Sequence, residues 1–414
     1  MVLSVNDVSV LRELAGRVAG IAALPVQDGT VSLWKQLNGL EPARPMVMID
    51  QVCWKEMDVD GELTLRTEDP FCRDLETRLR RTLYAWKHMP VDMVVEPVMD
   101  IPKVIRDTGL GIRTVERVAV TDPANNVVGH FYEDQLADEV DVEKIRTPEV
   151  TLDERATARV EEQAHTIFDG ILEVRMQGRF PVFSPWDTLV TWRGAESLLL
   201  DLAVRPEHMH RIISRVTDAL LAMLDQLEAR GLLGHSQSRI HCTGAYTDEL
   251  PAAGFDPARP RAKDLWTFGM SQIFSSVSPA MHRAFELDYA ERWHARFGLV
   301  YYGCCEPLDD KIDIIRSVPH VRKISMSPWV DVAKGAERIG RDFVFSRKPN
   351  PAFLATETWD PGLVERDLRE TATCCRRHGC PVELILKDIS TVRYEPQRLW
   401  AWADIAKRVA EDAA

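Results

Sequence analysis

Two adjacent cysteines and a glutamate follow the most strand-like segment of the chain. Residues 298–302 are glycine, apolar or aromatic, and Gly303 then leads into Cys304, Cys305 and Glu306. Thiolates and a carboxylate at the end of a parallel strand suit a borderline-soft metal ion or a nucleophilic thiol. The alternative is ordinary core packing, because free cysteine is among the most buried residue types. The pattern predicts catalytic roles for Cys304, Cys305 and Glu306.

Further metal ligands are expected at the same edge of the fold. His241 and Cys242 end an earlier strand-like run, and Asp388 ends the last one. Catalytic zinc usually has three protein ligands and one open position. We therefore expect zinc, or a similar divalent ion, at His241, Cys304, Cys305 and Asp388. Adjacent residues of an extended strand face opposite ways, so both cysteines can bind only if the chain turns between them. The alternative for His241 is a polar side chain whose hydrogen bonds are made within the protein. The alternative for Cys242 is a small residue packed in the core.

Polar and aromatic residues at other expected strand ends are candidates for substrate binding. An arginine next to a lysine suits a carboxylate, sulfonate or phosphate group, and the alternative for each charged residue is a loop salt bridge. These candidates are Asp50, Glu96, Trp186, Gln272, Arg347, Lys348 and Asn350.

The elements that must position these residues alternate between strands and helices. Strand signals lie near residues 46, 94, 181, 240, 300, 323, 344 and 384. Such alternation implies right-handed βαβ units and a parallel sheet, and eight units predict a single closed (β/α)8 barrel of the TIM type. Helical patterns over residues 6–24 and 31–40 make residues 1–43 an N-terminal helical cap, with the barrel over residues 44–414. Residues 110–133 predict a β-hairpin insertion, in which 118–120 pair with 127–131.

A long loop could cover the site, and the composition limits the expected partners and location. Residues 245–263 are rich in proline and glycine and are long enough for an active-site lid. The chain has 45% hydrophobic and 28% charged residues and a net charge of -13. It lacks long basic runs and long apolar runs, so nucleic acid and membrane are not expected partners. The eight cysteines are scattered or in adjacent pairs, which predicts a reducing cytoplasmic location. No Gly-x-Gly-x-x-Gly follows an early strand, which speaks against a dinucleotide site.

Several segments resemble the uroporphyrinogen decarboxylase superfamily. They are residues 271–282, 285–297, the strand into Cys304, 324–331, 336–340, 343–351 and 386–396. The resemblance spans residues 170–410 and implies a (β/α)8 barrel. True decarboxylases of the family are metal-free and use an arginine-rich motif, which residues 45–57 lack. The corrinoid-dependent methyltransferases use a zinc site formed by His-x-Cys and a later cysteine. Here the corresponding residues read Tyr302, Gly303 and Cys304, and the later cysteine falls near Asp388.

The resemblance and the thiol motif together favour methyl transfer. We expect zinc-dependent transfer between a small methylated substrate, or a thiol- or folate-type acceptor, and a corrinoid carried by a cobalamin-binding protein. The first alternative is a metal-free decarboxylase or lyase with Asp50 or Glu96 as its polar centre. The second is a non-enzymatic protein that binds a corrinoid or tetrapyrrole. The expected partners are a small-molecule substrate and a cobalamin-binding protein, and a homodimer is compatible with the sequence.

Overall fold

A parallel sheet forms the centre of the protein. The computed structural model describes residues 3–120 and 128–413. Six strands run in the order β1-β14-β13-β12-β11-β10. They are β1 (Met46–Ile49), β10 (Trp266–Gly269), β11 (Leu299–Tyr302), β12 (Val321–Met326), β13 (Val344–Arg347) and β14 (Val382–Leu386). Most of their residues are buried, as expected for parallel strands with both faces covered.

The register of this sheet brings the carboxyl ends of its strands to one edge. Ile49 pairs with Leu386, and Gly269 pairs with Tyr302. The residues that follow these strands therefore share one rim. The strand nearest the start of the chain, β1, pairs with the strand nearest its end, β14.

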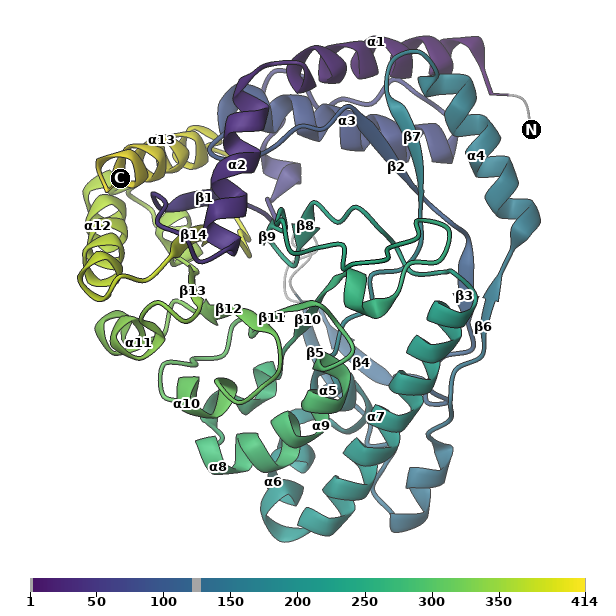
Figure 1. Cartoon of the computed structure of the whole chain (residues 1–414), viewed down its shortest axis with the longest axis vertical. Coiled ribbons are helices and arrows are strands. Elements are labelled where there is room, and N and C mark those ends of the chain that lie inside the picture. Colours follow the sequence, from purple (N-terminus) through teal and green to yellow (C-terminus); the bar gives the residue numbers. More distant parts are fainter. Residues whose placement is uncertain (1–2, 121–127, 414) are drawn as a thin grey trace.

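Helices surround the strands on the outside (Figure 1). They are α1 (Val5–Ala22), α2 (Val26–Asn38), α3 (Pro70–His88), α4 (Glu154–Phe168), α5 (Pro185–Arg193), α6 (Ala195–Val204), α7 (Pro206–Ala229), α8 (Pro279–His282), α9 (Asp288–His294), α10 (Ile312–Ile315), α11 (Val332–Ile339), α12 (Pro361–His378) and α13 (Gln397–Asp412). Local signals define several ends. Asp69 accepts a hydrogen bond from the Phe71 backbone N–H at 2.9 Å and begins α3. Gly379, with φ 72°, ends α12 in the left-handed conformation.

The N-terminal helices are packed into the fold. Trp34 of α2 is 1% exposed, and the Nζ atom of Lys323 lies 5.3 Å from its ring centre. Lys323 forms an ion pair of 2.7 Å with Glu383, and both side chains are fully buried. A helix from the start of the chain therefore covers an ion pair between β12 and β14.

Further strands pair outside the six-stranded sheet. β2 (Val98–Pro102) is parallel to β7 (Glu173–Gln177), and β3 (Ile105–Asp107) is antiparallel to β6 (Val150–Leu152). The predicted hairpin is confirmed as β4 (Glu116–Ala119) and β5 (Gly129–Tyr132). Its expected turn and Val127 lie outside the described residues. A small hairpin of β8 (Arg239–Ile240) and β9 (Thr243–Gly244) lies near the middle of the view in Figure 1.

Five of the expected strands, near residues 46, 300, 323, 344 and 384, are confirmed, and so is the α/β class with a parallel sheet. β10 was not predicted. The strand expected near 94 is wrong, because the Val95 N–H donates to the side chain of Gln27 at 2.9 Å instead of to a strand. Near 181 there are two isolated parallel bridges, from Arg179 to Leu233 and from Phe183 to Gly269, instead of a strand, since Pro181 between them has no N–H to donate. Near 240 the chain forms an antiparallel hairpin. Closure into an eight-stranded barrel stays a prediction.

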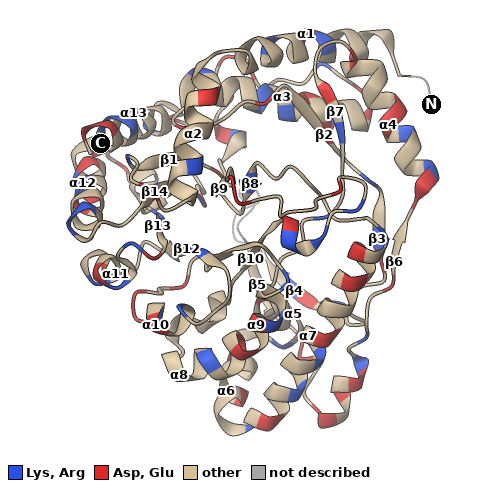
Figure 2. Cartoon of the chain, viewed as in Figure 1, with Lys and Arg blue, Asp and Glu red and all other residues tan. Residues whose placement is uncertain are grey.

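Charged side chains are spread over the outer helices (Figure 2). Both α7 and α12 carry acidic and basic residues, and neither sign forms a broad continuous face in this view. Within the described residues, no helix combines the length and apolar composition that a bilayer crossing needs.

Candidate thiol site

The chain turns sharply between β11 and the two cysteines. Gly303 has φ 90°, and a Cβ atom there would lie 2.3 Å from the Leu308 side chain. Only glycine adopts this conformation in such limited space. Because of the turn, Cys304 and Cys305 do not face opposite sides, and their Sγ atoms lie 3.6 Å apart. The turn that lets both thiols face one site is therefore present.

Glu306 holds the turn in place. Its side chain is fully buried and accepts hydrogen bonds from the backbone N–H groups of Ser271, at 3.1 Å, and Cys304, at 2.9 Å. The hydroxyl of Ser325 donates to the Cys304 carbonyl at 2.7 Å. Glu306 was expected to be catalytic, and in this arrangement its carboxylate positions the backbone of Cys304.

A lysine from the end of β14 lies against both thiols. The Lys387 Nζ atom lies 3.2 Å from the Sγ atom of Cys304 and 3.8 Å from that of Cys305. It also lies 2.8 Å from the Asp388 carboxylate, which in turn lies 3.5 Å from the Cys305 Sγ atom. Lys387 was not predicted, although its position after the last strand was visible in the sequence.

His241 reaches the site from the turn of the β8–β9 hairpin. Its ring stacks on Phe268 with centres 4.1 Å apart, and its Nε2 atom is buried without a hydrogen-bond partner among the described residues. Burial opposes a charged ring, but the neighbouring thiols of Cys242 and Cys304 outweigh it and raise the pKa of His241 to about 9. The ring is therefore a second cation beside Cys304.

These neighbours divide the two cysteines into a thiolate and a thiol. The thiol of Cys305 is the largest cause that lowers the pKa of Cys304, burial opposes it, and His241 and Lys387 add to it, so that the pKa falls to about 4. The pKa of Cys305 is raised by the neighbouring Cys304 thiolate and by burial. At neutral pH, Cys304 is the ionised and nucleophilic member of the pair.

Backbone strain accumulates around the same site. Gln51, His241 and Asp388 have φ values of 48°, 51° and 56°, a region that residues other than glycine rarely adopt. Gln51 follows β1, His241 lies between β8 and β9, and Asp388 follows β14. Such conformations persist only where the surrounding structure enforces them, and they are frequent at functional sites.

Three wholly or partly buried carboxyl groups, those of Asp187, Glu286 and Glu306, form a cluster near Cys304. Burial and the charges of Glu306 and Cys304 raise the pKa of Asp187 to about 7. Burial also raises the pKa values of Glu286 and Glu306, and neither carboxyl oxygen of Glu286 has a hydrogen-bond partner among the described residues. This cluster can hold or release a proton near neutral pH beside the thiolate. Glu286 was missed because it occurs within an ordinary helical pattern.

The predicted cationic residues after β13 make contacts within the protein. Arg347 pairs with Asp367 at 3.3 Å and donates to the Ser327 carbonyl at 2.5 Å. Lys348 donates to the hydroxyl of Ser346 at 2.7 Å and to that of Tyr301. Both cations are buried. Their role in holding a substrate anion stays a prediction.

The remaining predicted binding residues also have internal partners. The Asn350 side chain accepts from the Ala352 N–H at 3.0 Å and starts a short helical turn. Trp186 is fully buried and donates from its indole N–H to the Phe285 carbonyl at 3.1 Å. Gln272 donates to the sulfur of Met270 at 3.5 Å.

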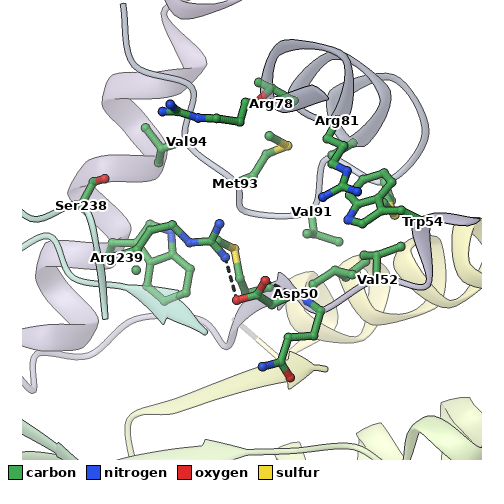
Figure 3. Close-up of a pocket in the computed structure, with 18 of the residues that line it drawn as sticks. Asp50, Val52, Trp54, Arg78, Arg81, Val91, Met93, Val94, Ser238 and Arg239 are labelled. Carbon is green, nitrogen blue, oxygen red and sulfur yellow. Dashed lines mark hydrogen bonds and ion pairs between the residues drawn. The ribbon is translucent and has the colours of Figure 1, made fainter. Parts of the chain in front are cut away.

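Asp50 and Glu96 line two neighbouring cavities. A cavity of about 390 Å³ contains Asp50, which pairs with Arg239 at 3.0 Å (Figure 3). A second cavity of about 190 Å³ contains Glu96, whose pKa is raised by burial although Arg175 opposes this. The second is lined partly by the predicted lid segment, including Thr247, Leu250, Pro251 and Phe255.

The larger cavity and the thiol pair share structural elements. Gln51 lines this cavity, and its carbonyl accepts from the Ile389 N–H at 3.2 Å, next to Asp388. The β8–β9 hairpin contributes Arg239 and Gly244 to the cavity and His241 to the thiol site.

Three of the four predicted metal ligands, Cys304, Cys305 and Asp388, lie around the ammonium group of Lys387. Lys387 lies between the sulfur atoms and the Asp388 carboxylate, where the predicted zinc ion would bind. The parts of the chain that the structure describes contain no group of three or more His, Cys, Asp or Glu side chains arranged to hold a metal ion. The donor set therefore does not fit zinc in this arrangement, and zinc binding stays a prediction that requires Lys387 to turn away.

Comparison with known sequences identifies no family for this chain. The sequence matches no family model and no curated protein. Among solved structures, the chain is similar to a methyltransferase from Methanosarcina mazei, with 12% identity and a TM-score of 0.49 over 92% of this chain and 98% of that chain. The functional argument therefore rests on the thiol site itself.

Proposed function

We propose that this protein transfers a methyl group and that the Cys304 Sγ atom is the nucleophile that accepts it. One observation carries the proposal: the Lys387 Nζ atom lies 3.2 Å from this buried sulfur. A thiolate rather than a thiol attacks carbon, and a neighbouring cation keeps the sulfur ionised at neutral pH. The charged ring of His241 acts in the same direction.

The chemistry divides into two displacements. In the first, the Cys304 thiolate attacks the methyl carbon of a donor, the C–S bond forms, and the donor leaves with the electron pair of the broken bond. In the second, an acceptor attacks the S-methyl carbon and Cys304 leaves as a thiolate. A stabilised thiolate of low pKa is a good leaving group, so Lys387 and His241 also assist the second step.

The family resemblance adds the donor to this proposal. It implies a methylated corrinoid on a cobalamin-binding protein, which would make that protein a partner. The charge that zinc supplies in the related enzymes would come from the ammonium of Lys387. The described donor set supports this replacement, because Lys387 lies among the predicted ligands.

Methylcobalamin serves as the probe for the first displacement. The protein is incubated with methylcobalamin under anaerobic conditions, and its peptides are analysed by mass spectrometry. We expect one added CH2 on the Cys304 peptide and an equal amount of reduced cobalamin. Cys304→Ser should abolish both signals, while Cys375→Ser, on α12, should leave them unchanged. Methylation that persists in Cys304→Ser would refute the assignment.

One observation favours the alternative of a metal-free decarboxylase or lyase. Asp50 and Glu96, its expected polar centres, both line cavities. Release of carbon dioxide from uroporphyrinogen, lost in Asp50→Asn or Glu96→Gln but retained in Cys304→Ser, would support this alternative. Binding of methylcobalamin without methyl movement would instead support the non-enzymatic reading.

A further inference from the structure

The larger cavity is positively charged although the protein is acidic. The chain has a net charge of -13, yet the cavity is lined by Arg78, Arg81 and Arg239 and by a single carboxylate, that of Asp50. Figure 3 shows Arg78 and Arg81 on α3 and Arg239 across the cavity beside Asp50. An excess of cations inside a concave site attracts anions.

The two arginines of α3 have N–H donors that could bind a ligand. Arg78 and Arg81 are three residues apart and therefore lie on the same side of the helix. Arg78 donates to the Asp100 carbonyl at 2.8 Å, and the guanidinium of Arg81 lies 5.1 Å from the Trp54 ring centre. Neither arginine forms an ion pair with any described residue. A guanidinium has five N–H donors in a fixed fork, which suits carboxylate and phosphate groups.

Arg239 differs because it already holds an anion. It pairs with Asp50 at 3.0 Å, and the two side chains are 50% and 27% exposed. The pair is open to solvent, so its attraction is weak and a ligand anion can compete with Asp50. The Asp50 carboxylate thus marks the place where Arg239 accepts an anionic group.

Much of the rest of the cavity wall is apolar, although Gln51, Thr82, Ser238 and Tyr246 also line it. The apolar part includes Trp34, Met48, Val52, Trp54, Val91, Met93 and Val94. Tryptophan beside an arginine gives a surface for a planar apolar group. The volume of about 390 Å³ is in the range of small-molecule sites.

We propose that this cavity binds a small organic dianion with a flat apolar body, such as an aromatic dicarboxylate. Arg78, Arg81 and Arg239 supply the positive charges for the two anionic groups, and the apolar part of the wall covers the body. As a substrate site this inference rests on the proposed methyl transfer. As a binding site it stands alone, and the experiment separates the two.

Isothermal titration with benzene-1,3-dicarboxylate tests the proposal. The wild type should bind this dianion, and the uncharged benzene-1,3-dicarboxamide should bind at least tenfold more weakly. Arg78→Met and Arg81→Met should each raise Kd about tenfold or more, because each removes a charged hydrogen-bond donor. Arg159→Met, an exposed arginine of α4 outside the cavity, should leave Kd unchanged. Phenyl phosphate tests whether the site prefers a phosphate group to a carboxylate. The anion that binds with the lower Kd identifies the preferred group.

Asp50→Asn gives a result that damage to the fold cannot imitate. Removing the competing carboxylate frees Arg239, so this variant should bind the dianion more tightly than the wild type. Equal binding of the dicarboxamide, or unchanged Kd values in both Arg78→Met and Arg81→Met, would overturn the proposal. Cys304→Ser should bind normally, so a failure of methyl transfer leaves this test intact.

Discussion

Replacing Lys387 with methionine should raise the pKa of Cys304 and slow its reaction in mildly acidic solution. The ammonium lies 3.2 Å from the Cys304 sulfur and is one of the groups that lower the pKa of this thiol to about 4. Methionine keeps a similar side-chain length and removes only the charge and the N–H donors.

The distance sets the size of the effect. At an effective dielectric constant of about 20, two unit charges at this separation attract by about 5 kcal/mol. Water that enters the space and the remaining charge of His241 would offset roughly half of this. The remainder, about 2.5 kcal/mol, corresponds to about 2 pKa units. The midpoint of Cys304 ionisation should therefore move from about 4 to about 6.

Alkylation by iodoacetamide measures this midpoint. The rate is followed on the Cys304 peptide by mass spectrometry between pH 3 and pH 9, and it falls as pH drops through the pKa, because only the thiolate reacts. At pH 5 the thiolate fraction should drop from about nine tenths to about one tenth, which makes the variant about tenfold slower. At pH 8 both proteins are ionised, and the variant should not be slower.

Lys387→Arg is the matched control, because it keeps the positive charge and should retain an acidic midpoint. Identical profiles for the wild type and Lys387→Met would show that the ammonium does not hold the thiolate. A wild-type midpoint near the ordinary cysteine value of about 8.5 would refute the reasoning altogether.

Three further predictions concern stability. Lys323→Met leaves Glu383 buried without its cation and should cost about 3–5 kcal/mol in chemical denaturation, whereas also changing Glu383 to leucine should recover most of the loss. The pKa of Asp187 is raised from 3.8 to about 7, so this group destabilises the fold increasingly as pH rises between these values. Asp187→Asn should therefore raise Tm more at pH 8 than at pH 5. An equal gain in Tm at both pH values would contradict this. Gly303→Ala forces Cβ against Leu308 and should cost more than about 1 kcal/mol and slow Cys304 alkylation, while normal stability and reactivity would disprove the need for this turn.

The strands that could be predicted are those with their own apolar signature. β1, β11 and β14 are short, mostly apolar runs, and buried parallel strands need such runs. β12 and β13 mix apolar residues with serine, lysine or arginine, and their alternation with helices made them predictable. The segment near Val94 has the same composition, but the side chain of Gln27 takes its backbone N–H. Such a contact between distant residues leaves no local pattern. Trp266–Gly269 was missed because four residues after a proline-rich loop carry little periodicity.

The thiol site was predicted as a set of residues but not as an arrangement. Cys304, Cys305 and Asp388 come together because the ends of parallel strands share one rim, whereas His241 arrives from the turn of the antiparallel β8–β9 hairpin. The sequence placed Lys387 beside Asp388, yet it could not show that this side chain points at the sulfur atoms. The residues that could bind a metal ion can be predicted from their types. Which group lies between them, here the ammonium of Lys387, depends on the direction of a side chain.

The pairing of β1 with β14 has a consequence for how the protein is made. Met46–Ile49 leaves the ribosome long before β14, the strand that hydrogen-bonds to it, has been synthesised. Trp34 likewise contacts Lys323 of β12, which is synthesised much later. Such distant contacts slow folding and leave apolar segments exposed during synthesis. The nascent chain should therefore need protection by chaperones until β14 has been synthesised. Ribosome-bound chains that stop before β14 should remain sensitive to proteases around residues 46–49.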